Sequence, residues 1–241
     1  MTTRIGLVGI SLGGLDAAIF RGINRFARPQ HRWHIVTGNA HDDSFAAMLA
    51  QDLRGVIGHI NTPAVARRLR DRDIPTVNLS GVFPEAGFPL VRPDDRAVGA
   101  LAARYLAERG FHHRAYLAGN DYYQREREAG FGAAHSFRVE VGADRLSPAG
   151  NASFDERQRS EWLRSLPKPV GILTAHDRLA LQLLDLCHSL GFDVPGAVAI
   201  VGVDNEELVC ESSWPTLSSV ALPGEQIGME AARLLAGLMA G

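Results

Sequence analysis

The sequence predicts an α/β protein of two lobes, each built on a parallel sheet flanked by helices. Short apolar runs alternate with amphipathic stretches along most of the 241 residues, and this alternation favours parallel strands joined by right-handed crossovers. Runs such as 198–201 are apolar throughout, as in strands buried on both faces. A turn-rich segment at 83–89 precedes an expected crossing between the lobes at 90–94, and a second crossing is expected near 221–223.

The individual elements follow from this alternation. Strands are expected at 5–10, 33–37, 56–60, 76–79, 115–118, 171–174, 198–203 and 218–222. Helices, whose apolar residues recur at helical spacing, are expected at 16–26, 44–53, 63–71, 95–109, 126–135, 155–166, 177–190 and 224–239. Asp95 and Asp177 are the expected N-caps, and Gly110 and Gly191 the expected C-caps. The lobes are then 1–92 with 222–241, and 93–221.

Composition excludes several classes of function. With 46% hydrophobic and 22% charged residues, the chain has the composition of an ordinary globular protein. Its net charge of −2 does not predict a basic surface that would bind nucleic acid or an anionic membrane. The N-terminus lacks the features of a signal peptide, and no apolar run approaches the ~18 residues of a membrane span. We therefore expect a cytoplasmic protein with no membrane partner. Cys187 and Cys210 fit no disulfide framework or zinc spacing, and no metal or cofactor is expected.

One motif points to an enzyme. Residues 9–13, GISLG, match the nucleophile elbow of serine hydrolases and place Ser11 between a strand and a helix. Asp177 and His188 would complete the chain order of a triad, but they fall on one expected helix, and only one strand precedes Ser11. A hydrolase therefore remains only an alternative. The same glycines do not form a dinucleotide-binding fingerprint, because the G-x-G-x-x-G spacing is absent.

Polar side chains recur where expected strands end and helices begin, the edge at which open α/β sheets bind ligands. They are the 11–16 loop, His176 with Asp177, and Asp204 with Asn205, joined by Arg125 and Arg127 beside Tyr122 and Tyr123. Carboxylates and guanidinium groups match the vicinal hydroxyls of a sugar, and aromatic faces pack on its C–H surface. Any one of Asp94, Asp177 and Asp204 could simply cap a helix, but their recurrence at one edge favours a cleft for a polar ligand.

Several segments resemble a known family. VAIVGVDNEE at 198–207, Cys210 and PTLSSV at 215–220 resemble the effector-binding domain of sugar-responsive bacterial transcription regulators. Those domains have two Rossmann-like lobes, the type I periplasmic-binding-protein fold shared with the lactose/galactose repressor family. The similarity is greatest to xylose-operon regulators of AraC type, in which a helix-turn-helix domain follows the sugar-sensing domain. Further matches lie at 54–58, 74–81, 125–131 and 166–172, so the resemblance covers essentially the whole chain.

The resemblance implies roles for individual residues. Arg127, in its R-x-x-G-F pattern, is similar to an arginine that clamps sugar hydroxyls, and Asp204, in G-V-D-N, to an aspartate that accepts from them. His176 stands before Asp177 where the family usually has Asn or another small polar residue. The remaining implied contacts are Ser11, Leu15, Asp16 and Ser80. The glycine-rich loop at 11–14 departs from the pattern of the xylose regulators.

The resemblance also implies a function without catalysis. A pentose such as xylose would bind between the lobes, and the resulting closure would reposition the DNA-binding domains of a homodimer. A DNA-binding domain is expected after residue 241, so this chain by itself is not expected to bind an operator. A secreted solute-binding protein of the same fold is an alternative, opposed by the N-terminal sequence.

Overall fold

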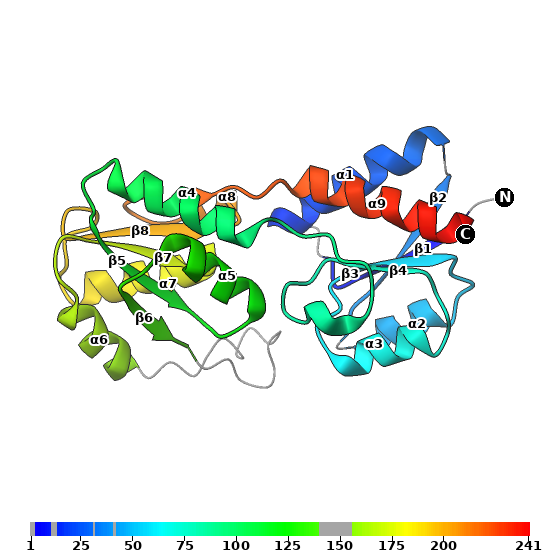
Figure 1. Ribbon diagram of the computed structural model, residues 1–241, viewed down its shortest axis with the longest axis horizontal. Helices are drawn as coiled ribbons and strands as arrows, with labels where there is room; N and C mark the ends of the chain where they lie inside the picture. Colours follow the sequence, from blue (N-terminus) through cyan, green and yellow to red (C-terminus); the bar gives the residue numbers. More distant parts are fainter. Residues whose placement is uncertain (1–2, 11–13, 31, 41, 140–155) are drawn as a thin grey trace. The chain divides into compact units, whose positions relative to one another are not determined.

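The computed structural model describes residues 3–10, 14–30, 32–40, 42–139 and 156–241. The chain divides into two compact units, which we call unit 1 (Met1–Pro93 with Pro223–Gly241) and unit 2 (Asp94–Leu222). Their boundaries lie one residue after those expected from the sequence. Each unit contains a parallel sheet with helices on both faces, so the expected fold class is confirmed (Figure 1).

Unit 1 has a four-stranded sheet in the order β2-β1-β3-β4. Its strands are β1 (Thr3–Val8), β2 (Trp33–Gly38), β3 (Gly55–Gly58) and β4 (Thr76–Asn78). Helices α1 (Gly14–Gln30) and α9 (Gly224–Ala240) cover one face, and α2 (Asp43–Leu49) and α3 (Pro63–Arg70) cover the other (Figure 1). Alternate residues of β1 therefore enter different cores: Ile5 and Leu7 pack with α1 and α9, and Val8 packs with α2 and α3. A short 3-10 helix, η1 (Pro84–Ala86), follows β4.

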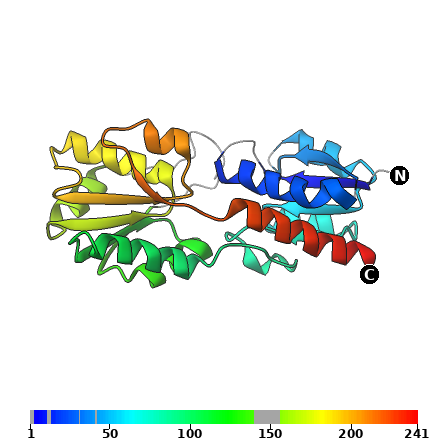
Figure 2. The ribbon, with the colours of Figure 1, turned by 90° about the horizontal axis from the view of Figure 1, so that it is seen from above.

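Unit 2 has a five-stranded sheet in the order β6-β5-β7-β8-β9. Its strands are β5 (His113–Ala118), β6 (His135–Arg138), β7 (Val170–Thr174), β8 (Val198–Val203) and β9 (Ser218–Val220). Helices α4 (Asp95–Ala107) and α5 (Tyr122–Phe131) lie on one face, and α7 (Asp177–Ser189) and α8 (Glu207–Glu211) lie on the other (Figure 2). Helix α6 (Glu156–Ser165) precedes β7. Strands β7 and β8 are buried at every residue, as their largely apolar sequences predict.

Each unit contains a pair of helices in close contact through glycine. In unit 1, a Cβ atom at Gly228 of α9 would lie 2.0 Å from the carbonyl oxygen of Ile19 in α1. In unit 2, a Cβ atom at Gly99 of α4 would lie 2.0 Å from the carbonyl oxygen of Arg127 in α5. Both distances are too short for any side chain, so these glycines allow the helix backbones to approach.

The structure corrects several expected elements. The helix expected at 126–135 ends at Phe131, because Gly132 adopts a left-handed conformation with φ of 65°, and β6 begins at His135. Strand β6 pairs with a single neighbour, so its sequence HSFR carries no buried apolar run. The short helix α8 was also not expected.

The expected caps shift by one or two residues, and Gly110 lies two residues beyond Glu108, the C-cap of α4, with φ of 87°. Asp94, not Asp95, caps α4 and accepts from the backbone N–H of Ala97, and His176, not Asp177, caps α7. Gly191 lies one residue beyond the C-cap of α7 with φ of 72°. Within the described ranges, no helix is long and apolar enough to cross a membrane.

Candidate functional site

The carboxyl edge of the unit 2 sheet brings together polar residues from separate parts of the chain. Because β5, β7 and β8 are parallel, the segments that follow them lie at one edge. These segments carry Tyr123 and Arg127 on α5, His176 before α7, and Asp204 after β8. The Arg127 guanidinium lies over the Tyr123 ring and donates to the carbonyl oxygen of Ala175, next to His176, and the charge of Asp204 acts on the pKa of Tyr123. We therefore treat these four side chains as one cluster.

Arg127 is held rigidly inside unit 2. Only 5% of its side chain is exposed, and its Nε–H donates to Asp95 Oδ1 over 2.9 Å. Nη1 donates to the carbonyl oxygen of Ala175, directly after β7, and the guanidinium carbon lies 4.9 Å from the centroid of the Tyr123 ring. The guanidinium therefore bridges α4, α5 and the end of β7. Among the described residues Nη2 has no hydrogen-bond partner, so Nη2 is the part of Arg127 that a ligand can contact.

His176 is partly exposed, and its ring accepts a hydrogen bond that caps α7. Its ring Nδ1 accepts from the backbone N–H of Leu179 at 3.2 Å, which caps α7. Burial, followed by the positive charges of Arg127 and Arg178, lowers the pKa of His176 to about 4. The imidazole is therefore neutral at physiological pH.

Asp177 is fully buried and holds the edge together. Its Oδ2 accepts from the backbone N–H of Glu206 at 2.7 Å, and its Oδ1 accepts from the Ser219 hydroxyl at 2.6 Å. Burial raises the pKa of Asp177, and these two hydrogen bonds act against that rise. The carboxylate thus joins the start of α7 to the segment after β8 and to β9.

Asp204 has an unusual backbone conformation for a residue with a side chain. Its φ is 105° and that of Asn205 is 53°, both in a region that favours glycine. The turn is held by bonds from the backbone N–H of Asp204 to the Val220 carbonyl and from that of Asn205 to Ser219 Oγ. Such strain persists only where surrounding bonds impose it, and it is commonly found at functional sites.

Tyr123 is the aromatic member of the cluster. Burial raises the pKa of its hydroxyl to about 12, and the negative charges of Asp121 and Asp204 add to the rise while Arg127 opposes it. The hydroxyl therefore stays protonated, and it accepts a bond from the Gln124 amide at 2.8 Å.

Unit 1 carries a second, smaller group of polar residues at its own carboxyl edge. Asp16, at the start of α1, lies 3.0 Å from Nε2 of His59, which follows β3. The side chains of Asp16 and His59 are 21% and 25% exposed. This pair comes from two different strand ends of the same sheet.

Two other predicted residues of unit 1 have structural roles. The Ser80 hydroxyl accepts from the backbone N–H of Val82, and its own backbone N–H donates to Asn78 Oδ1, so Ser80 is buried within a turn. Leu15 packs against the core that α1 shares with α9. Ser11 lies outside the described residues.

Sequence reasoning missed three residues of these groups. Asp95 was expected only as a cap, whereas its carboxylate binds Arg127. Tyr123 was noticed beside Arg127 but not selected, although a spacing of four residues places two side chains on the same helix face. His59 fell inside the strand expected at 56–60, whereas β3 ends at Gly58, so the strand-end rule that selected Asp16 did not select it.

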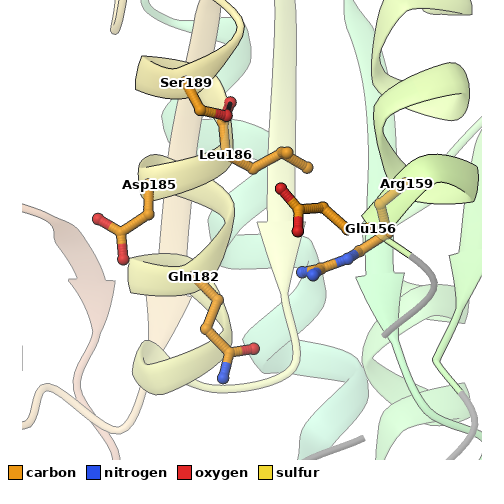
Figure 3. Close-up of a pocket in the computed structure, with 6 residues that line it drawn as sticks. All are labelled: Glu156, Arg159, Gln182, Asp185, Leu186 and Ser189. Carbon is orange, nitrogen blue, oxygen red and sulfur yellow. Dashed lines mark hydrogen bonds between the residues drawn. The ribbon is translucent and has the colours of Figure 1, made fainter. Parts of the chain in front are cut away.

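A pocket also lies on the helical face of unit 2, between α6 and α7 (Figure 3). Its volume is about 440 Å³, and it is lined by Glu156, Arg159, Gln182, Asp185, Leu186 and Ser189. None of the predicted site residues lines it. In the described part of the chain, no group of three or more His, Cys, Asp or Glu residues could hold a metal ion.

Comparison with known proteins assigns the family. Residues 103–241 match the model of the periplasmic binding protein-like domain. The chain belongs to this family. Its fold is also that of a solved xylose-binding transcription activator, with a TM-score of 0.80 at 24% identity over 100% of this chain and 64% of the other. A LacI family regulator from Enterococcus faecium with bound ribose gives a TM-score of 0.71 at 22% identity, covering 97% of this chain and 89% of the other.

Curated relatives of this periplasmic-binding-protein-like chain are transcription regulators, not enzymes. The xylose operon regulatory protein of Haemophilus influenzae is 27% identical over 241 residues, covering 94% of this chain and 62% of the relative. The protein of the same name from Escherichia coli K12 is 30% identical over 196 residues, covering 77% of this chain and 50% of the relative. The chain thus spans one half to about three fifths of these relatives. Their functions run against the hydrolase alternative for Ser11.

Proposed function

We propose that the chain is the sugar-sensing effector-binding domain of a bacterial transcription regulator, and that it binds a pentose such as xylose without chemical change. The observation that carries this proposal is the cluster of Tyr123, Arg127, His176 and Asp204 at the carboxyl edge of unit 2. The regulators among its relatives support the class, and two of them, both xylose operon regulatory proteins, support xylose as effector.

The cluster suits a neutral polyhydroxylated ligand. Arg127 Nη2 offers donors, the Asp204 carboxylate offers acceptors, and adjacent sugar hydroxyls can satisfy both. The Tyr123 ring offers an apolar face against which sugar C–H groups pack. Because the Arg127 charge is already balanced by Asp95 and the cluster also contains Asp204, the edge has no excess positive charge for a phosphate. In this proposal Asp177 positions the edge of unit 2, and Asp16 with His59 is the corresponding polar pair at the edge of unit 1.

Ligand contacts at this edge are connected to both points where the chain passes between the units. Arg127 binds Asp95, the residue directly after the first passage at 93–94. Asp177 binds Ser219 of β9, three residues before the second passage at 222–223. A sugar that binds one arrangement of these segments better than another shifts their equilibrium, which is the requirement for allosteric signalling. We propose that a separate DNA-binding domain in a cytoplasmic homodimer receives this signal.

The experiment is a thermal-shift screen with D-xylose, D-ribose and other pentoses and hexoses, followed by calorimetry of the best ligand. A sugar at 100 times its Kd should stabilise the fold by about 2.7 kcal/mol. Asp204→Asn removes the charge, and Asn tolerates the positive φ. It should weaken binding by about 2–3 kcal/mol, because sugar hydroxyls lose a charged acceptor.

Asp73→Asn is the matched control, because Asp73 is also an aspartate with positive φ, 50°, but lies in the exposed turn after α3. This variant should bind as the unaltered chain does. The proposal is wrong if no sugar raises the melting temperature, and the assignment of the site is wrong if Asp204→Asn binds normally.

A further inference from the structure

We infer that His176 selects among sugars by presenting a single hydrogen-bond donor, its Nε2–H, while its Nδ1 caps α7. This inference rests on the proposed sugar-binding function and adds to it the hydrogen-bond polarity that the ligand must satisfy at this position. Where an asparagine would offer both an amide donor and a carbonyl acceptor, His176 offers one donor on a longer, rigid ring.

The cap determines the tautomer of the ring. Nδ1 accepts from the backbone N–H of Leu179 at 3.2 Å, and only a nitrogen with a free lone pair accepts. A neutral imidazole that accepts at Nδ1 carries its proton on Nε2. Because the two ring nitrogens point in nearly opposite directions, the Nε2–H is directed away from the start of α7.

The surroundings keep the ring neutral. The positive charges of Arg127 and Arg178 add to burial in lowering its pKa to about 4. The negative groups close to it are engaged elsewhere: Asp177 accepts from Ser219 and Glu206, and the Glu206 carboxylate lies 3.6 Å from Arg178. The ring therefore does not gain a second N–H in the physiological range.

The donor is free and lies at the candidate site. Among the described residues none accepts from Nε2, and the His176 side chain is partly exposed at the edge that carries Arg127 and Asp204. A ligand at this point must supply an oxygen lone pair, from a hydroxyl or a ring oxygen. A sugar with an ammonium group in the same place offers only donors and is rejected.

Two substitutions separate the cap from the donor. In His176→Asn the side-chain oxygen takes the place of Nδ1 and keeps the cap, but the group at the Nε2 position is lost. In His176→Gln the amide nitrogen reaches the Nε2 position, but the cap is lost. We expect His176→Asn to retain the melting temperature and to bind D-xylose and D-ribose about tenfold more weakly. We expect His176→Gln to melt about 2–4 °C lower and to bind within about threefold of the unaltered chain.

Nuclear magnetic resonance of the imidazole nitrogens tests the donor without any sugar. The expected spectrum shows His176 as the Nε2–H tautomer between pH 5.5 and 8, with no titration in that range. An Nδ1–H tautomer or a titration near the ordinary histidine pKa would overturn the inference. So would a His176→Asn variant that binds both pentoses like the unaltered chain.

The failure of this inference differs from that of the proposed function. If the unaltered chain binds no sugar of the screen, the proposed function fails and the ligand role of His176 fails with it. If it binds a sugar and His176→Asn binds that sugar equally well, only the present inference fails.

Discussion

The two units share an architecture but differ in what they bury. Each has a parallel sheet and a pair of helices in contact through glycine, Gly228 in unit 1 and Gly99 in unit 2. Among the described residues of unit 1, those that are buried and polar are all uncharged: Thr76, Asn78 and Ser80. Those of unit 2 include four charged side chains: Asp95, Arg127, Arg159 and Asp177.

This difference makes the carboxyl edge of the unit 2 sheet more rigid than that of the unit 1 sheet. Charges in a poorly solvated interior are stable only with well-placed partners, so Arg127 and Asp177 each have one geometry. The unit 1 pair of Asp16 and His59 is partly solvated and rearranges at little cost. In the proposed function, unit 2 therefore supplies the pre-organised contacts with the ligand, and pre-organisation lowers the entropic cost of binding.

The largest expected difference between the units is in their ion pairs. Asp95→Ala leaves the Arg127 guanidinium buried without its carboxylate and should lower the free energy of unfolding by about 3–5 kcal/mol. Asp16→Ala in unit 1 should cost less than about 1 kcal/mol, because both partners are partly exposed. Urea denaturation of the two variants measures this. Equal losses would remove the distinction between the two edges.

The glycine contacts test whether helix packing in unit 2 controls the site. Gly99→Ala and Gly228→Ala place a methyl group 2.0 Å from a carbonyl oxygen in the partner helix, and each should cost about 3 kcal/mol. The carbonyl that Gly99 contacts is that of Arg127, so Gly99→Ala should also weaken sugar binding, about tenfold. Gly228→Ala should weaken sugar binding less, because its methyl group displaces α1 of unit 1 and not the helix that carries Arg127. Calorimetry with the best sugar measures the affinity of each variant. Equal affinities would mean that the contact between α4 and α5 does not control sugar binding.

The smallest effect expected is on stability as the pH falls. The pKa of His176 is about 4 in the folded chain and near its ordinary value of about 6.5 when unfolded. Between these values unfolding takes up a proton, so stability should fall by about 2–3 kcal/mol as the pH is lowered from 6.5 to 4. Asp177 acts in the opposite direction, because its raised pKa makes the folded chain bind a proton first.

His176→Asn isolates the histidine contribution. The variant keeps the cap of α7 and should show a flatter dependence of unfolding free energy on pH than the unaltered chain. Parallel slopes for the two proteins would mean that His176 titrates normally in the folded state.

The sequence predicted most of the fold because its signals are local. Strand β8 was placed residue for residue, since an unbroken apolar run between turns has few other structures. Strand β6 was missed, because a short edge strand buries little and HSFR has no apolar pattern. The N-caps of α4 and α7 were each misplaced by one residue. Asp94 and Asp95 are adjacent, as are His176 and Asp177, and either polar side chain of each pair can cap a helix.

By itself the sequence determined the class of fold, the succession of strands and helices, and the candidates at the strand ends. Tertiary structure decided which partners each candidate meets. Arg127 meets a carboxylate 32 positions away and Asp177 a hydroxyl 42 positions away. Such pairs depend on strand order and helix packing, and no local pattern encodes them. The same residue type therefore joins two segments from a buried position at Asp177 and lies in a strained turn at Asp204.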